Sequence, residues 1–318
     1  NFLGVKIDLP TVDMKRRTTG TDGDGEIYLV QDYKKFEKAN RLVPNVKLPA
    51  NAPLHDPFVL RYHHYSLVMN RKYRMCMFTA SNCDYRDEMR KDPRKRSAFG
   101  SESWKADPRV PLEYQLLDKE IYQPARNVDR GHVHRREDNC WGSAGMQTEY
   151  ANSDTYHWTN CTPQHELFNQ ENPAGYDKQK GIWGWFEGEL EEQIHKSGGQ
   201  AVLFAGPVLD EQHGAWQTLK NGKVFIPYKF WKVVVVPEST ARNAPLLAYG
   251  FLFDQSDVIQ KYGLDIQEAL ELPDFKRQQV TIEEISTLSG VVFDKKVRDA
   301  DQHPGAKKST ETKLKLGK

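Results

Sequence analysis

The sequence predicts an α+β protein, with a mixed, largely antiparallel sheet and helices packed on its faces. Three observations lead to this class. Apolar runs of strand length recur along the chain, two of them are separated by a short polar turn, and one long segment is amphipathic with the period of a helix. We therefore expect sheet strands joined by at least one hairpin, with the helix packed against them.

The strands are expected in order along the chain. "YSLVMN" (65–70) and "RMCMFTAS" (74–81) flank the polar "RKY" and predict an early hairpin. The later apolar runs "AVLFAGPVL" (201–209), "VFIPYKFWKVVVV" (224–236) and "LAYGFLF" (247–253) predict the remaining strands. None approaches the roughly 20 apolar residues that a membrane span requires, so no membrane partner is expected.

The helices follow from periodicity and caps. Between residues 180 and 199, apolar residues recur every four positions from Ile182 to Ile194, and Ser197-Gly198-Gly199 supplies a stop. Residues 281–290 predict a shorter helix with Thr281 as its N-cap. Residues 154–164 alternate bulky and polar side chains and predict a strand that halts at Pro163. Residues 164–170 then predict one helical turn.

Composition predicts three regions. Residues 1–55, rich in Pro, Gly and charge, form an N-terminal extension, residues 56–295 form the folded domain, and residues 296–318 form a basic, flexible tail. Hydrophobic residues at 38% and aromatic residues at 11% suit a folded core. The net charge of +1 does not indicate a polyanion partner, and the basic run at 86–96 suits either a solvated loop or a phosphate-contacting surface.

Cysteine usage bears on compartment and metal. Cys76, Cys83, Cys140 and Cys161 include no C-x-x-C pair, which disfavours a zinc knuckle, and four cysteines in so long a chain do not demand a disulfide framework. We expect a cytoplasmic protein. The alternative is a secreted or periplasmic protein whose signal peptide has been removed.

A set of polar side chains in the middle of the chain matches the needs of phosphodiester hydrolysis. A histidine can deprotonate water near neutral pH, and an arginine and a hard divalent cation can offset the charge that develops on phosphorus. Mg²⁺ prefers oxygen ligands and needs few from the protein. The set is Asp129, Arg130, His132, Asn160, Gln164, Asn169 and Glu187. Taken singly, each also suits a turn, a cap or a structural histidine.

The order of these residues is more informative than any one of them. "DRGH" (129–132), "TNCTPQ" (159–164), "FNQ" (168–170) and the Trp183–Glu187 spacing together resemble the DNA/RNA non-specific endonuclease family, the ββα-metal nucleases that include endonuclease G. The resemblance covers about residues 56–294 and is closest to bacterial members. It implies a ββα-metal finger, with "DRGH" on one strand, "TYHWTNC" on the other and residues 164–195 as the helical part.

The resemblance also implies a role for each residue. His132 would be the general base, Asn169 the direct ligand of Mg²⁺ (with Mn²⁺ as a substitute), and Glu187 would reach the metal through water. Asn160 would lie beside the metal and orient the site. The expected products carry 5′-phosphates.

The remaining residues would bind the substrate or support the site. Arg130 would contact the phosphate, Asp129 would fix the loop, and Gln164 would belong to the polar shell. Glu191 stands where relatives often carry an arginine, so we expect Arg135, Arg136 or Arg86 to compensate. An inserted loop between Asn169 and Trp183 would cover or gate the groove.

Two other functions stay open at this stage. The scaffold fits a catalytically weak nucleic-acid-binding module, and His132, His134, Cys140 and Cys161 would have to gather for a zinc enzyme. Expected partners are the DNA or RNA backbone, a second copy of the chain in a homodimer, and an upstream regulatory domain or an inhibitor, because an unrestrained nuclease would damage its host.

Overall fold

A computed structural model describes residues 7, 10–12, 59–90, 103–125, 127–142, 145–173, 181–219, 221–241, 243–262 and 278–306. Most of the predicted N-terminal extension, the end of the basic run at 86–96, the centre of the inserted loop and the last twelve residues lie outside these segments. Within them, no helix combines the length and hydropathy needed to cross a membrane.

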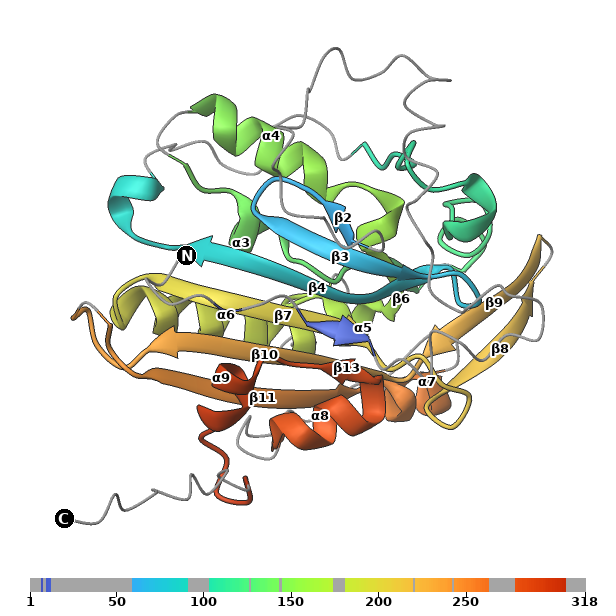
Figure 1. Ribbon diagram of the computed structural model, residues 1–318. Helices are drawn as coiled ribbons and strands as arrows, with labels where there is room; N and C mark the ends of the chain where they lie inside the picture. The colour runs from blue at the N-terminus through green and yellow to red at the C-terminus, as the bar shows by residue number, and fades with distance from the viewer. Residues whose placement is uncertain are drawn as a thin grey trace, which may run out of the picture.

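A seven-stranded sheet runs through the middle of the molecule, in the order β12-β11-β10-β7-β4-β3-β2 (Figure 1). Its strands are β2 (Val59–Arg61), β3 (Tyr65–Asn70), β4 (Met75–Asp84), β7 (Gln200–Pro207), β10 (Lys229–Pro237), β11 (Leu246–Asp254) and β12 (Gln279–Val280). All its pairings are antiparallel. The largely antiparallel sheet and the early hairpin are thus confirmed, and parallel pairing in the described segments is limited to two isolated bridges.

The predicted strand at 224–236 is two strands. β9 (Gly222–Pro227) pairs with β8 (Gly214–Leu219) in a hairpin that projects from the side of the molecule, whereas β10 begins at Lys229 and pairs within the main sheet (Figure 1). Pro227 has no backbone N–H to continue a ladder. The apolar run continues through the break because both strands are buried there.

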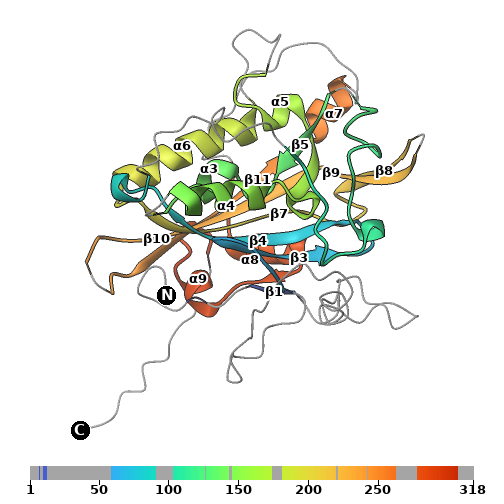
Figure 2. The same ribbon diagram turned by 90° about the horizontal axis from the view of Figure 1, so that it is seen from above.

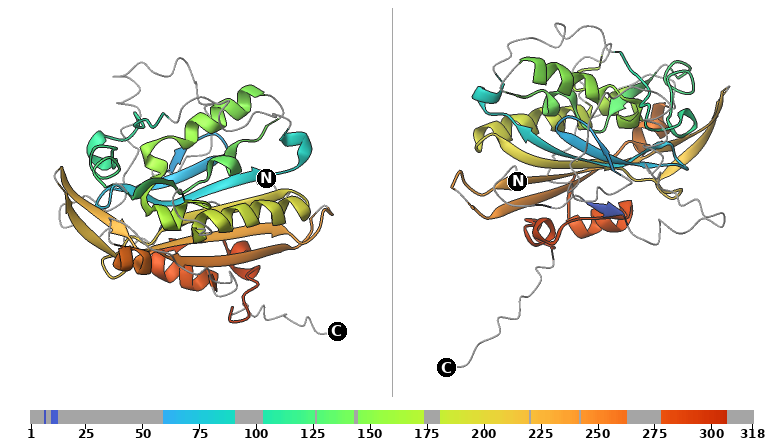
Figure 3. Two further views of the ribbon diagram at one scale, coloured as in Figure 1. Left: turned by 180° about the vertical axis from the view of Figure 1, so that it is seen from behind. Right: turned by 45° about the horizontal axis from the view of Figure 1, so that its top comes forward.

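Elements pack on both faces of the sheet (Figures 2 and 3). One face carries α8 (Ile282–Ser289), α9 (Lys295–Asp299) and the β1 (Thr11–Val12)–β13 (Val291–Val292) pair. The opposite face carries α3 (Arg136–Asn139), α4 (Gly145–Thr155), α5 (Glu166–Asn169) and α6 (Ile182–Lys196). Shorter elements complete the described chain: η2 (Asp87–Met89), η4 (Leu112–Tyr114), η5 (Trp158–Asn160) and α7 (Ser256–Tyr262).

The two longer predicted helices are confirmed, including their ends, whereas the turn predicted at 164–170 is α5, which begins at Glu166. α6 ends at Lys196, and Gly198 and Gly199 follow with φ of +115° and +78°, a region that favours glycine. The Thr281 hydroxyl accepts the Glu284 backbone N–H at 3.0 Å at the start of α8. Val297 of α9 is fully buried, so the compact part of the described chain extends past residue 295.

The strand predicted at 154–164 is misplaced. Residues 154 and 155 end α4, and Trp158–Asn160 form the 3₁₀ turn η5. The strand is β6 (Cys161–His165), which pairs with β5 (Val128–His132), and Pro163 lies inside it opposite Arg130. A two-stranded ribbon has an unpaired edge on every strand, and edge positions tolerate proline. The bulky residues before Cys161 therefore belong to a helix end and a turn.

Candidate active site

The β5–β6 ribbon presents the "DRGH" residues, and Gly131 lets the ribbon close. A Cβ atom at Gly131 would lie 2.3 Å from the side chain of Gln164, which is fully buried beneath it. The Gln164 side chain thus fills the space that a side chain at position 131 would need, so only glycine fits there. Gln164 was expected in the polar shell of the site; its side chain is fully buried next to Gly131 and does not line the cavity described below.

Asn160 holds the chain just after β5. Its side-chain oxygen accepts the His134 backbone N–H at 2.9 Å, and its NH₂ group donates to the carbonyls of His134 and Thr155 at 3.0 and 3.1 Å. The Asn160 carbonyl accepts the Val133 N–H at 3.0 Å. Asn160 is fully buried, so it orients the segment that follows His132 without reaching the cavity directly.

Asp129 organises the α5 end of the site. One of its oxygens accepts the Asn169 side-chain NH₂ at 2.8 Å, and the Gln170 NH₂ group donates to both oxygens at 3.0 and 2.8 Å. Because a carboxylate is an acceptor, it binds the NH₂ end of the Asn169 amide and leaves the carbonyl oxygen as the donor atom for a cation. Asp129 therefore fixes the geometry of Asn169, as the sequence predicts for the loop.

Two glycines bring α6 against the Asn169 turn. A Cβ at Gly184 would lie 2.4 Å from the Asn169 carbonyl oxygen, and one at Gly181 would lie 2.4 Å from the Gln170 carbonyl oxygen. The Gly181 N–H donates to the same Gln170 carbonyl at 2.7 Å. The inserted loop therefore returns to its starting point, and Asn169 and the helix stay adjacent despite the insertion.

The result is one polar cavity of about 510 Å³. His132 from β5, Asn169 from α5 and Glu187 from α6 line it together with Asp129 and Arg130. Of the residues expected in the site, Asn160 and Gln164 lie outside this cavity. The other five converge on it from three separate elements.

Aromatic rings brace the imidazole of His132. The Trp104 ring lies 4.6 Å from it and the Tyr156 ring 5.2 Å from it, measured between ring centroids. His134 points away from the cavity and is buried, with its Nε2 2.9 Å from the Asn139 side-chain oxygen. Burial lowers the pKa of His134 to about 4, so this second histidine is a neutral structural residue.

Glu187 is part of a buried group of charges. Its Oε1 accepts a hydrogen bond from the Lys232 ammonium at 2.6 Å, and both side chains are nearly inaccessible to solvent. Burial raises the pKa of Glu187, against the opposing attraction of Lys232 and Arg135. Burial acts in the same direction on Asp138, but there the cations of Lys232 and Arg135 prevail and lower its pKa.

The arginines divide by their contacts. Arg130 is 41% exposed and pairs with Asp118 at 2.7 Å, so its guanidinium lies at the mouth of the cavity. Arg135 lines the cavity and pairs with Glu191 at 2.8 Å, while Arg136 is buried and donates to Asn152. Arg86 pairs with Asp84 and does not line the cavity.

Lys232 is the functional neighbour that sequence reasoning missed. It lies in β10, where Trp231, Val233 and Val235 pack with the α8 and α9 side of the core. Alternation along a strand directs Lys232 to the other face, over Trp183 and against Glu187. A lone lysine inside the apolar run "FWKVVVV" was the available signal, because a buried cation needs a buried anionic partner.

The donor set suits a hard cation with few protein ligands. The described residues contain no cluster of three or more His, Cys, Asp and Glu side chains able to hold a metal. The zinc alternative, which needs four such ligands, therefore finds no support in these segments. An amide oxygen with its NH₂ tied to Asp129, facing a cavity that also holds a carboxylate, fits Mg²⁺, which keeps most of its water.

Comparison with known proteins identifies the class. Residues 48–300 match the family of DNA/RNA non-specific endonucleases. The chain belongs to this family, as the spaced motifs predict.

Two particular proteins are similar to it. The uncharacterized protein y4fB of Sinorhizobium fredii (strain NBRC 101917 / NGR234) is 35% identical in an alignment of 263 residues that covers 78% of this chain and 35% of y4fB. The chain thus spans about a third of that relative's length. A crystal structure of an EndoG/EndoGI complex, solved to explain EndoG inhibition, has a similar fold. Its TM-score is 0.50 at 15% identity, over 74% of this chain and 84% of that one.

Proposed function

We propose that this protein is a Mg²⁺-dependent endonuclease that hydrolyses phosphodiester bonds of DNA or RNA with little sequence preference. The convergence of His132, Asn169 and Glu187 on one cavity carries the proposal. Few other reactions need an imidazole, a cation site of amide and carboxylate oxygens, and an arginine at the cavity mouth.

His132 is the general base. Its imidazole takes a proton from a water molecule, whose oxygen attacks phosphorus. The bond from phosphorus to the 3′ oxygen breaks, and the departing oxygen takes a proton from solvent to become the 3′-hydroxyl. The phosphate then remains on the 5′ end of the following nucleotide. The rings of Trp104 and Tyr156 pack against the imidazole, which favours a base that must meet its proton within hydrogen-bond reach.

Asn169 would hold the cation directly and Glu187 would reach it through water. When bound, Mg²⁺ supplies charge stabilisation for the negative oxygens at phosphorus, and Mn²⁺ can substitute for it. Lys232 holds the Glu187 carboxylate at a fixed place, and Asp129 does the same for the Asn169 amide.

Arg130 contacts the phosphate of the substrate. It combines the greatest exposure of the three cavity arginines with a position at the mouth. Arg135 and Arg136 add positive potential while tied to Glu191, Glu137 and Asn152. Contacts of this kind position the backbone and read no bases, consistent with weak sequence preference.

A plasmid-nicking assay tests the proposal. His132→Ala should lower the cleavage rate about 10²–10⁴-fold, because a general base contributes that much, while binding of uncleaved DNA in EDTA stays unchanged. Excess EDTA should stop the wild-type protein, and added Mg²⁺ should restore it.

His195→Ala is the matched control, since it removes a half-exposed imidazole from the outer surface of α6. It should cleave at the wild-type rate. If His132→Ala kept most of the wild-type cleavage rate, His132 could not be the general base. Wild-type protein that binds DNA without cutting it in Mg²⁺ or Mn²⁺ would instead identify a binding module on this scaffold.

A further inference from the structure

A second cavity of about 740 Å³ adjoins the polar one. Arg130 lines both cavities, so they meet at the guanidinium assigned to the substrate phosphate. The lining of the second cavity differs in kind from that of the first. Trp104, Trp158, Ala106 and Leu117 form much of its wall.

The aromatic wall is a stack of rings next to the proposed base. Trp104 stacks on Trp158 with centroids 5.2 Å apart and planes 24° apart, and Trp158 stacks on Tyr122 in turn. Trp158 is almost fully buried, whereas Trp104 is half-buried, and both line the cavity. Trp104 also contacts His132. A planar group on this wall would therefore lie within one side chain of the reacting centre.

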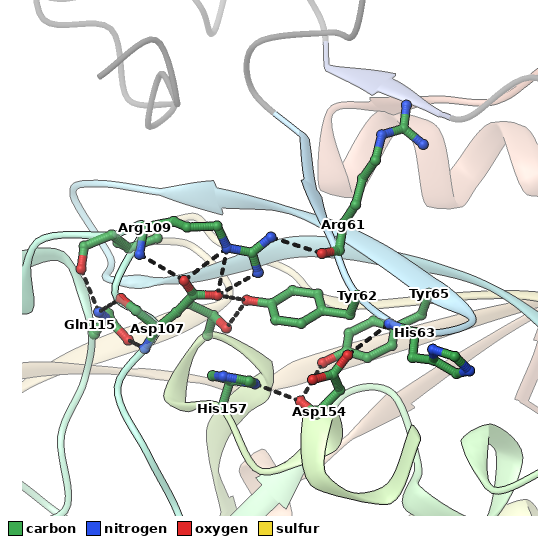
Figure 4. A network of polar contacts seen from close by, with 11 residues as sticks. Arg61, Tyr62, His63, Tyr65, Asp107, Arg109, Gln115, Asp154 and His157 are labelled. Atoms are coloured by element: carbon green, nitrogen blue, oxygen red, sulfur yellow. Dashed lines mark hydrogen bonds and ion pairs between the residues drawn. The ribbon is translucent and has the colours of Figure 1, made fainter. Parts of the chain in front are cut away.

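The segment that carries Trp104 is held in place before any ligand binds. The Lys105 N–H donates to the Tyr156 carbonyl at 2.9 Å, and the Lys105 carbonyl accepts the Trp158 N–H at 3.0 Å. Figure 4 shows the adjoining anchor, in which Arg109 and the Tyr62 hydroxyl both donate to the buried Asp107 carboxylate. A preformed wall avoids the entropy cost of ordering on binding.

The charges that line the second cavity balance. Asp118, Lys119, Glu120 and Arg130 all line it, and Asp118 pairs with Arg130 while Glu120 pairs with Arg74. With two acidic and two basic side chains, this lining has no net charge to attract a second phosphate. An uncharged, planar group with hydrogen-bonding edges suits such a lining and gains contact with the indoles.

We propose that the second cavity binds one unpaired nucleobase of the substrate strand, next to the phosphate held at Arg130. The inference rests on the proposed nuclease function and adds its substrate class. A base in a duplex must leave its stack and partner to enter such a cavity. Single-stranded nucleic acid is thus the preferred substrate.

Binding in EDTA tests this without cleavage. The probes are a fluorescein-labelled single-stranded DNA hexamer and a hexamer of abasic sugar-phosphate units, which share the same backbone charge. The wild-type protein should bind the base-bearing probe about 5- to 150-fold more tightly, the range expected for one stacked base. Leu117→Trp, which adds a larger side chain to the cavity lining, should reduce that ratio to near one. Trp104→Leu should do the same by removing the stacking ring.

Each outcome decides the proposal. Equal binding of both probes by the wild-type protein would overturn it. A preference that survives Leu117→Trp, in a variant with an unchanged circular dichroism spectrum, would place base binding elsewhere and also overturn it. The nuclease function is scored separately by adding Mg²⁺ to the base-bearing probe, so a protein that binds through this cavity without cutting would refute only the proposed chemistry.

Discussion

The two faces of the central sheet differ in what they bury, although the same strands form both. On the α8 and α9 face, Trp231, Val233 and Val235 of β10 pack into a large apolar cluster with Ile285 and Val297. On the α6 face, the residue between Trp231 and Val233 is Lys232, and its ammonium is paired with Glu187. The α6 face has its own apolar cluster around Trp183 and Phe186, but it also encloses this ion pair next to a polar cavity.

The buried ion pair on the α6 face lowers the stability of the fold and serves the site. Burying an ion pair rarely stabilises a fold relative to apolar residues of the same volume, because both ions lose their water. The α6 face keeps such a pair directly beneath the site, along with Asp138 and Arg135. We infer that these charges are held for the geometry of Glu187, and that the apolar clusters on both faces supply the stability that offsets them.

The largest expected effect comes from breaking the pair on the α6 face. Lys232→Met should lower the free energy of unfolding by about 3–5 kcal/mol, the usual cost of leaving one buried charge without its partner, and should abolish cleavage. Urea unfolding and the plasmid assay measure the two effects. Lys232→Met combined with Glu187→Leu should regain most of the stability, since both charges are gone, and should stay inactive.

Val233→Ala makes the matching change on the α8 and α9 face. It should cost about 2 kcal/mol through the lost methyl groups and the cavity left behind, with cleavage per folded molecule unchanged. If Lys232→Met were no more destabilising than Val233→Ala, or if the double variant cut DNA, the contrast between the faces would be wrong.

A smaller effect on the free energy of unfolding is expected from pH, through a buried histidine on the α6 face of the sheet. The folded-state pKa of His134 is about 4, below the unfolded value of about 6.5. Between these values the unfolded chain binds a proton that the folded chain does not. Stability conferred by neutral His134 is therefore complete above pH 6.5 and is lost as the pH falls toward 4, by about 3 kcal/mol in total.

Urea unfolding at several pH values between 7 and 4 measures that slope. His134→Gln should reduce this slope by the amount that corresponds to about one proton taken up on unfolding. His165→Gln should do likewise, because burial also lowers the pKa of His165 to about 4. An unchanged slope in both variants would show that these imidazoles become charged in the folded protein as readily as in the unfolded one.

Much of this architecture was predictable because local pattern and burial agree. The 3.6-residue period of α6 follows from its one buried face, and the continuous apolar runs of β3, β4 and β7 follow from burial on both faces of those strands. The motif spacing likewise predicted that His132, Asn169 and Glu187 gather. Asp129, expected to fix the loop, does so through hydrogen bonds to the Asn169 and Gln170 side chains.

The features that the sequence did not reveal have a common cause, since they depend on partners distant in sequence. Gln164 and Asn160 are polar residues near the motif, but their surroundings bury them, one under Gly131 and the other against the backbone of His134. Residues 154–160 carry bulky side chains that alternate as in a strand, yet they pack in a helix end and a turn. Lys232 could be linked to Glu187 only once β10 and α6 were known to face each other.

The smallest expected effect on the free energy of unfolding comes from two glycines of α6, which also separate the geometry of the site from the stability of the fold. A Cβ at Gly184 would meet the backbone of Asn169 and Glu171 at 2.4 and 2.5 Å, whereas one at Gly188, a turn later, would meet only the Glu171 side chain at 3.5 Å. Gly184→Ala must push α6 away from the Asn169 turn. Misplacement of about 1 Å can cost roughly 10²-fold in rate, although the gain in helix propensity of about 1 kcal/mol offsets much of the strain on stability.

Gly188→Ala gains the same helix propensity without the clash, so it should raise the free energy of unfolding by about 0.5–1 kcal/mol and cleave normally. Thermal unfolding and initial cleavage rates of the two variants, side by side, make the test. Equal rates would mean that the separation between Asn169 and Glu187 tolerates movement of the helix. A slow Gly184→Ala beside a normal Gly188→Ala would instead tie cleavage to the close contact of α6 with the Asn169 turn, because both variants add the same methyl group to the same helix.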